Sequence, residues 1–258
     1  MRCGSGGTPP DAIVGGKIVD PAGVGSALRQ LLGRTEIHES RAMIAVNDIV
    51  ASFKILRVPA STTDASVDAL VGRELPLDAE RFGAKWVETH RGSTIRTIYA
   101  TAWDRSLIKN VIAAAKAAGL EAAVVEPKSA SLARTVSTPS CILVDIGTDT
   151  VDIVLIDGHI PQLWQSFDLN VPVGEDLTPA LTAPLRTVLR FYERQISGGF
   201  GPSSPILISG DQSPSSQVMA GLARALGHPV ELLPSPPRVP DIRYGTYLTC
   251  LGMLMRRG

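Results

Sequence analysis

The stretch CILVDIGTDTVDIVLIDG, residues 141–158, decides how this chain is interpreted. Two apolar runs flank a short segment of Asp, Gly and Thr, which is typical of two β-strands joined by a turn. Asp145 ends the first run, and Gly147 lets backbone N–H groups approach an oxyanion because it has no Cβ. Thr148 and Thr150 add hydroxyl groups, and the Asp145 carboxylate suits Mg²⁺. The segment is therefore either an ordinary hairpin turn or a turn that holds nucleotide phosphates.

The sequence after the turn differs from that of the commonest nucleotide-binding folds. P-loop and dinucleotide-binding signals run from a strand through a glycine loop into a helix. Here the turn is followed by a second strand and then by a third apolar stretch, QLWQSFDL, residues 162–169. A phosphate-binding turn at this place would therefore belong to a hairpin within three consecutive strands.

Composition and charge bound the class of protein. The 258 residues, 44% of them hydrophobic, suffice for one large domain or two closely associated halves. Lys plus Arg and Asp plus Glu balance at 25 each, and aromatic residues make up 5%, so we expect no nucleic-acid partner. Three distant cysteines predict neither disulfides nor a zinc site. No run reaches the roughly 18 apolar residues of a membrane span, so we expect membrane association only through a partner.

Helical and strand-like segments surround the hairpin. Strands are predicted over 41–47, 50–59, 84–92, 94–103 and 121–125, and helices over 21–32, 63–75, 104–118, 183–196, 213–227 and 246–257. Thr63 or Asp64 is the expected N-cap of one helix and Asp104 of another, which Gly119 should end. Pro184 is expected near the start of its helix. Residues 41–101 would thus form a small β-α-β module.

In their order and spacing these segments resemble the PilM family, cytoplasmic actin-like proteins of type IV pilus assembly. The stretch from YATAWDRSLIK to KSASLAR, residues 99–134, is similar to the family's crossover helix, AGLE turn and EP-x-S linker. Residues 142–158 match its second phosphate hairpin, VPVGEDLT (171–178) its glycine turn, and YLTCLGMLMRR (247–257) its closing helix. The resemblance implies an α/β, actin-like (ribonuclease H-like) ATPase fold with an inserted small α+β subdomain.

On this resemblance the chain divides into four parts. We expect a disordered tail over residues 1–11, a first actin-like half over 12–40 and 102–140, an inserted subdomain over 41–101, and a second half with the phosphate hairpin over 141–258. The family's first phosphate motif, an Asp-x-Gly turn, has no counterpart before Asp11, so the fold is expected to be N-terminally shortened.

The resemblance also implies where ATP and Mg²⁺ would bind, if they bind at all. The expected nucleotide-site residues are Asp145, Gly147, Thr148, Thr150, Gly174, Ser209 and Gly210, with Asp145 at the metal. With one phosphate motif missing and an acidic Asp211 where a small residue is expected, binding should be weak or absent. An active actin-like ATPase and an FtsA-type cytoskeletal or cell-division filament protein remain the alternatives.

The family's partner is the cytoplasmic tail of PilN, which lies in a groove beside the inserted subdomain. The implied function is that of a cytoplasmic scaffold of a type IV pilus or related secretion complex, at the inner face of the inner membrane, with oligomers possible. In this chain we expect an apolar trough with a basic rim to hold the tail, formed by Lys54, Arg57, Val67, Leu70 and Val71. Alternatively, Val67 and Leu70 simply close the core of the subdomain.

Overall fold

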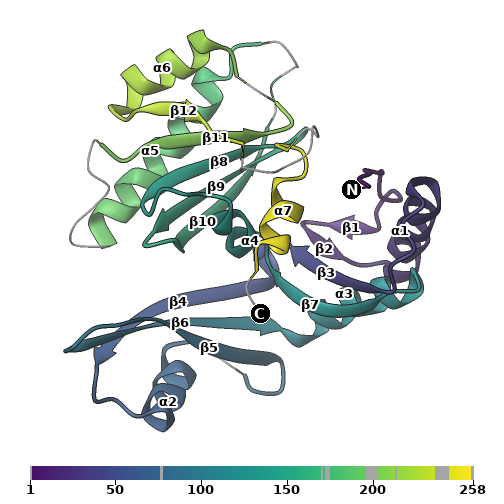
Figure 1. The fold of residues 1–258 in the computed structure, drawn as a ribbon, viewed down its shortest axis with the longest axis horizontal. Helices are drawn as coiled ribbons and strands as arrows, with labels where there is room; N and C mark the ends of the chain where they lie inside the picture. Colours follow the sequence, from purple (N-terminus) through teal and green to yellow (C-terminus); the bar gives the residue numbers. More distant parts are fainter. Residues whose placement is uncertain are drawn as a thin grey trace. The chain divides into compact units, whose positions relative to one another are not determined.

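The computed structural model describes residues 2–75, 78–169, 171, 175–195, 203–212, 214–235 and 244–256. The chain forms two compact units, which we call unit 1 (Met1–Lys128) and unit 2 (Ser129–Gly258) and describe separately (Figure 1). Within the described ranges no helix is both long enough and apolar enough to cross a membrane.

The described residues of unit 1 form three small sheets and three α-helices. Its elements are β1 (Ile13–Val14), β2 (Lys17–Ile18), α1 (Pro21–Thr35), β3 (Arg41–Val46), the 3-10 helix η1 (Asp48–Val50), β4 (Ala51–Pro59), α2 (Asp64–Glu74), β5 (Phe82–Arg91), β6 (Ile95–Asp104), α3 (Arg105–Ala117) and β7 (Glu121–Pro127). The sheets pair β1 with β2, β3 with β7, and β4, β6 and β5 in that order.

Unit 2 is built on one five-stranded sheet. Its elements are α4 (Lys128–Arg134, beginning at the unit boundary), β8 (Cys141–Ile146), β9 (Thr150–Asp157), β10 (Ile160–Asp168), α5 (Thr178–Gln195), β11 (Ile206–Gly210), α6 (Ser216–Leu226), β12 (Val230–Leu232) and α7 (Leu248–Leu254). The strand order is β10-β9-β8-β11-β12, with β8, β9 and β10 antiparallel and β8, β11 and β12 parallel.

Helices cover both faces of the unit 2 sheet, which explains the nearly unbroken apolar run of β8. Side chains alternate along a strand, so Ile142 and Val144 join α5 and α6 in one core, while Cys141 and Leu143 join α4 and α7 in the other. Figure 1 shows α5 and α6 together on one side of this sheet. The hairpin predicted from residues 141–158 is present, with Ile146 paired to Val151.

The three-stranded sheet of unit 1 carries α2 on one face. Leu56 and Val58 of β4 and Ile98 and Ala100 of β6 form a buried core with this helix. The Arg96 guanidinium ties the start of α2 to the sheet, since it donates to Asp64 at 2.8 Å and to Glu88 at 2.6 Å. Thr63 caps α2 as predicted, because its hydroxyl accepts from the Ser66 N–H.

Sequence analysis placed β3 in one module with the rest of residues 41–101, but the strand pairing differs from this. β3 lies parallel to β7, whereas β4, β5 and β6 form their own antiparallel sheet. The strand–helix–strand run β6-α3-β7 therefore joins two different sheets. Helix α3 packs on α1, where Gly25 lies so close to Ala117 that a Cβ would approach its methyl group to 2.5 Å.

Two further details differ from the sequence prediction. Helix α5 begins at Thr178, so Pro184 lies inside the helix and not near its start. The short hairpin β1-β2 was not predicted, although Gly15 and Gly16 (φ 54° and 74°) mark such a turn. Residues 2–11, the expected disordered tail, include Gly4 beside Leu31 and Thr35 of α1.

Candidate functional site

The predicted phosphate hairpin lies at the end of β8 where its parallel neighbour β11 also ends. Asp145 is buried there and pairs with Asp152 across the β8-β9 ladder. Gly147 begins the turn, and its backbone N–H donates to the Thr150 carbonyl at 2.8 Å. Thr148 and Thr150 are exposed at the tip. The Gly147 N–H is thus already bonded within the turn.

The structure brings the β11 residues of the predicted site beside the hairpin. Ser209 pairs with Asp145, and Gly210 with Ile146, in the parallel register of β8 and β11. The Ser209 hydroxyl is buried and has no hydrogen-bond partner among the described residues. Gly174, the remaining predicted residue of this site, lies outside the described residues.

Gln212 is a residue of this site that sequence analysis missed. Its side-chain amide donates to the backbone carbonyls of Gly147 at 3.3 Å and Thr148 at 3.4 Å. The backbone N–H groups of Asp211 and Gln212 both donate to the Ile146 carbonyl. These bonds tie the hairpin to the loop after β11. The nearest signal in the sequence was the polar turn that follows the buried strand 205–210.

One backbone donor of the predicted phosphate hairpin, the Gly147 N–H, is already used within the turn. The Gly147 N–H donates to the Thr150 carbonyl, and the Gln212 amide donates to the Gly147 and Thr148 carbonyls. Among the described residues, no group of three or more His, Cys, Asp or Glu side chains is placed to hold a metal ion. Asp145 as a magnesium ligand stays a prediction.

The apolar trough predicted in the inserted subdomain is closed. Val67 and Val71 are 0% and 4% exposed in the core between α2 and the sheet, and Leu70 packs against that core. Val67 and Leu70 therefore belong to the core, whereas Val71 also lines an open pocket of about 340 Å³ beside Trp86. The physical reason is that a three-stranded sheet needs a covering helix to bury its apolar face, and α2 supplies it.

Lys54 and Arg57 do not share a face. Lys54 has the same strand parity as Leu56 and Val58, and its ammonium pairs with Glu74 of α2 at 2.6 Å. That hydrogen bond lowers the pKa of Glu74. Arg57 is exposed and three residues further along, so its side chain projects from the opposite face of β4. The two cations cannot form one rim.

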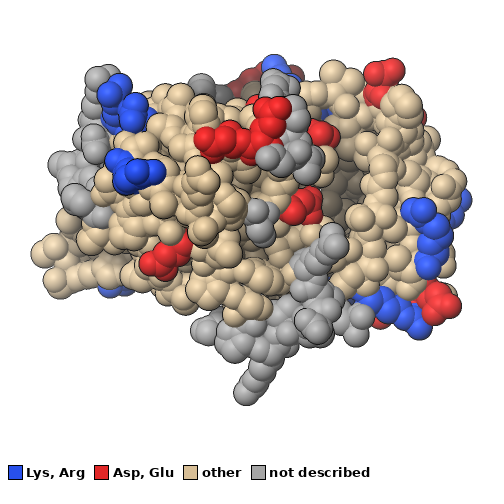
Figure 2. Space-filling view, turned by 90° about the horizontal axis from the view of Figure 1, so that it is seen from above, with Lys and Arg blue, Asp and Glu red and all other residues tan. Residues whose placement is uncertain are grey.

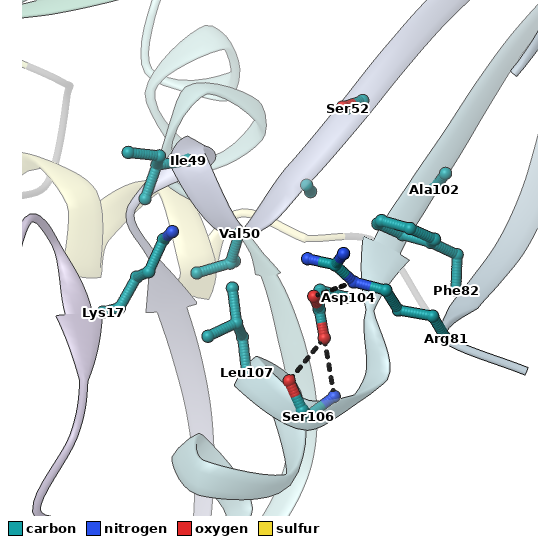
Figure 3. Close-up of a pocket in the computed structure, with 11 residues that line it drawn as sticks. Lys17, Ile49, Val50, Ser52, Arg81, Phe82, Ala102, Asp104, Ser106 and Leu107 are labelled. Carbon is teal, nitrogen blue, oxygen red and sulfur yellow. Dashed lines mark hydrogen bonds and ion pairs between the residues drawn. The ribbon is translucent and has the colours of Figure 1, made fainter. Parts of the chain in front are cut away.

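An open cavity of about 350 Å³ lies in unit 1 where the sheet extends beyond α2 (Figure 3). Ser52 and Ala102, which pair across β4 and β6, lie on the same sheet face as the core under α2. The lining residues are Lys17, Ile49, Val50, Ala51, Ser52, Arg81, Phe82, Ala102, Asp104, Ser106 and Leu107. They come from β2, η1, β4, β5, β6, α3 and the segment before β5.

Asp104 organises one wall of this cavity. Its carboxylate accepts from the Ser106 hydroxyl at 2.6 Å and backbone N–H at 2.9 Å, which caps α3 as predicted. The Arg81 Nε donates to it at 3.0 Å. The Ser106 hydroxyl and then Arg81 outweigh burial and lower the pKa of Asp104 to about 2. The carboxylate is thus charged at neutral pH.

Replacing Asp104 with asparagine should make stability less dependent on acid pH. The variant keeps a cap acceptor and loses the charge, so we expect a loss of about 1 kcal/mol at neutral pH. Because the folded-state pKa is depressed from 3.8 to about 2, the wild-type advantage is present above 3.8 and disappears as pH falls through 2. Urea unfolding of both proteins across this range would measure it. A difference that does not change with pH would contradict this role of the charge.

Charged residues are dispersed on the face drawn in Figure 2, where Lys, Arg, Asp and Glu form small groups between uncharged residues. No single sign dominates the described part of that face. Recognition of a charged ligand there would depend on individual side chains and not on an extended field.

Comparison with known proteins supports the fold. No family model and no curated protein matches the chain. The solved structure of a PilM-PilN type IV pilus biogenesis complex matches with a TM-score of 0.73 at 19% identity, over 97% of this chain and 89% of that chain. The cytoplasmic domain of EpsL, an inner membrane component of the type II secretion system of Vibrio cholerae, has a TM-score of 0.49 at 13% identity, over 78% and 79% of the two chains. A Bacteroides thetaiotaomicron protein with an actin-like ATPase fold has 0.47 at 13%, over 90% and 81%. The match to the PilM-PilN structure confirms the expected α/β fold.

Proposed function

We propose that this protein is a cytoplasmic scaffold of a type IV pilus or related secretion assembly complex, and that it binds the cytoplasmic tail of a PilN-like membrane protein. The observation that carries the proposal is the fold match, with a TM-score of 0.73 over 97% of this chain, to a structure of a PilM-PilN complex. A tail of this kind would bring the protein to the inner face of the inner membrane. Nucleotide binding is proposed to be weak or lost, since the hairpin N–H is already bonded.

The cavity lined by Ser52, Arg81 and Asp104 is the proposed tail site, in place of the trough predicted from Lys54, Arg57, Val67, Leu70 and Val71. It lies on the exposed end of the three-stranded sheet, and β4 is an edge strand of that sheet. An extended peptide can combine backbone pairing at a strand edge with side chains held in a neighbouring pocket. Ile49 and Leu107 offer apolar contact, while Ser52 and Arg81 offer polar groups.

Replacing Ser52 with tryptophan should block tail binding. Ser52 is exposed on the cavity floor, so the indole would occupy space that the tail needs. Tryptophan is favourable in strands and the site is exposed, so stability should change by less than about 0.5 kcal/mol. We expect the affinity for a fluorescein-labelled synthetic tail of the PilN-like protein to fall at least about tenfold, a cost of about 1.4 kcal/mol, in an anisotropy titration.

Arg57→Trp is the matched control for this experiment. It introduces the same side chain at an exposed position of the same strand, but on the opposite face. We expect its tail affinity to equal that of the wild type. Loss of binding by Arg57→Trp, together with normal binding by Ser52→Trp, would place the tail on the other face. Failure of the wild type to bind the tail would overturn the proposed function.

A further inference from the structure

The cavity of unit 1 carries a local excess of positive charge. Among the ionisable residues that line it, Lys17 and Arg81 are cations and Asp104 is the anion. The Asp104 carboxylate is already satisfied by Ser106 and by the Nε of Arg81. One positive charge is therefore left over at the cavity, and a ligand with a negative group would complement it.

Arg81 is held in place while part of its guanidinium faces the cavity. Its Nε donates to Asp104 at 3.0 Å, and its guanidinium carbon lies 5.0 Å from the centroid of the Phe82 ring. Its side chain is 65% exposed, and Figure 3 shows its terminal nitrogens directed towards Val50. A guanidinium fixed in this way is pre-organised for a carboxylate, because little side-chain freedom is lost when the bond forms.

Lys17 supplies a second cation from a different element. Figure 3 shows its ammonium group directed towards Ile49 and Val50. Within the described part of the chain it has neither an ion pair nor a hydrogen bond through its side chain. Strand β2 is anchored to α3 because the Asn110 side chain donates to the Ile18 carbonyl at 2.9 Å. The lysine is thus presented at the cavity by a fixed strand.

Apolar side chains lie between the two cations. Val50 is 4% exposed, Ile49 is 50% exposed, and Leu107 is half-buried. A ligand that fits must combine a negative group with an apolar group a short distance away. A single inorganic anion would leave the apolar surface uncovered, and a purely apolar ligand would desolvate the two cations without compensation.

We propose that the cavity recognises a tail segment in which an Asp or Glu carboxylate neighbours an apolar side chain, an inference that rests on the tail-binding function above. The carboxylate binds the terminal nitrogens of Arg81, and Lys17 adds a longer-range attraction. The apolar side chain packs on Ile49 and Leu107. This assigns Arg81 and Lys17 as residues that determine which tail is bound.

The test compares two synthetic tails of the PilN-like protein, one native and one with each Asp and Glu changed to its amide. One charge-assisted hydrogen bond to a carboxylate corresponds to roughly a tenfold or larger change in affinity. We therefore expect the amide tail to bind wild type at least about tenfold more weakly in anisotropy titrations. Lys17→Gln should weaken the native tail by a few-fold, and Lys109→Gln, an exposed lysine of α3 that does not line the cavity, should not.

Arg81→Gln in the protein and the change from acid to amide in the tail form a double-mutant cycle. The variant should bind the native and amide tails almost equally, because the carboxylate has lost its partner. Arg81→Gln also removes the partner of Asp104, so Lys17→Gln, which has no such contact, provides an independent arm. Equal binding of both tails by wild type, or binding of a tail that has no carboxylate, would overturn this inference and leave the proposed function standing. If wild type binds neither tail, the proposed function itself falls, and the inference with it.

Discussion

Gly210→Ala should lower the stability of unit 2 by about 3 kcal/mol or more. Gly210 has a φ of 115°, which side chains other than glycine rarely adopt. A Cβ at this position would lie 2.1 Å from the Ile146 carbonyl oxygen and 2.5 Å from its nitrogen. Both atoms belong to the backbone of β8, so neither can move aside without breaking the sheet.

Gly158→Ala is the control for this prediction. Gly158 also has a positive φ, 60°, but no atom lies within 4 Å of a Cβ built there. It should therefore cost only the backbone strain, about 1–2 kcal/mol. Calorimetric melting of both variants would compare them. Equal melting temperatures for Gly210→Ala and Gly158→Ala would show that the backbone of β8 adjusts to the added methyl group.

The expected result also bears on how Gly210 is interpreted. Sequence analysis placed it at a nucleotide site, where glycine permits close approach of a ligand. The close approach in the structure is that of its own chain. A Cβ on Gly210 would meet Ile146, and a Cβ on Gly245 would lie 2.4 Å from the Gly210 carbonyl oxygen. Loss of any activity in a Gly210 variant would therefore report on folding first.

Titration of Mg-ATP into the protein should give no binding in the micromolar range. The Gly147 N–H donates to the Thr150 carbonyl at 2.8 Å. A phosphate would have to break the turn before it could accept from this N–H. Each charge-assisted bond that does not form costs about 1.5–3 kcal/mol, or a factor of roughly ten or more in affinity.

Isothermal titration calorimetry would test the absence of tight nucleotide binding. Asp145→Asn is the companion variant, because it preserves the shape of the side chain and removes the charge that Mg²⁺ would need. A micromolar dissociation constant for wild type, with binding lost in Asp145→Asn, would contradict the prediction and place a magnesium nucleotide at the hairpin. It would also restore the ATPase alternative to consideration.

The sequence by itself determined the elements whose signals are local. The strands on either side of Gly147 follow from two apolar runs, and the starts of α2 and α3 follow from Thr63 and Asp104, whose side chains bond N–H groups three and two residues away. Gly119 ends α3 with a φ of 87°, as a glycine after a helix should. Each of these depends on a few neighbouring residues, so one chain suffices to predict it.

Only the tertiary structure decided which predicted residues are available and which others join them. Val67 and Val71 present the same apolar pattern whether they line a groove or close a core, and α2 buries them. Arg81 meets Asp104 across 23 residues of chain, and Gln212 meets Gly147 across 65. Strand β3 pairs with β7 and not with the strand that follows it. Contacts between distant residues are set by how whole elements pack, because burial and hydrogen bonding are satisfied over the entire unit and not within a local segment.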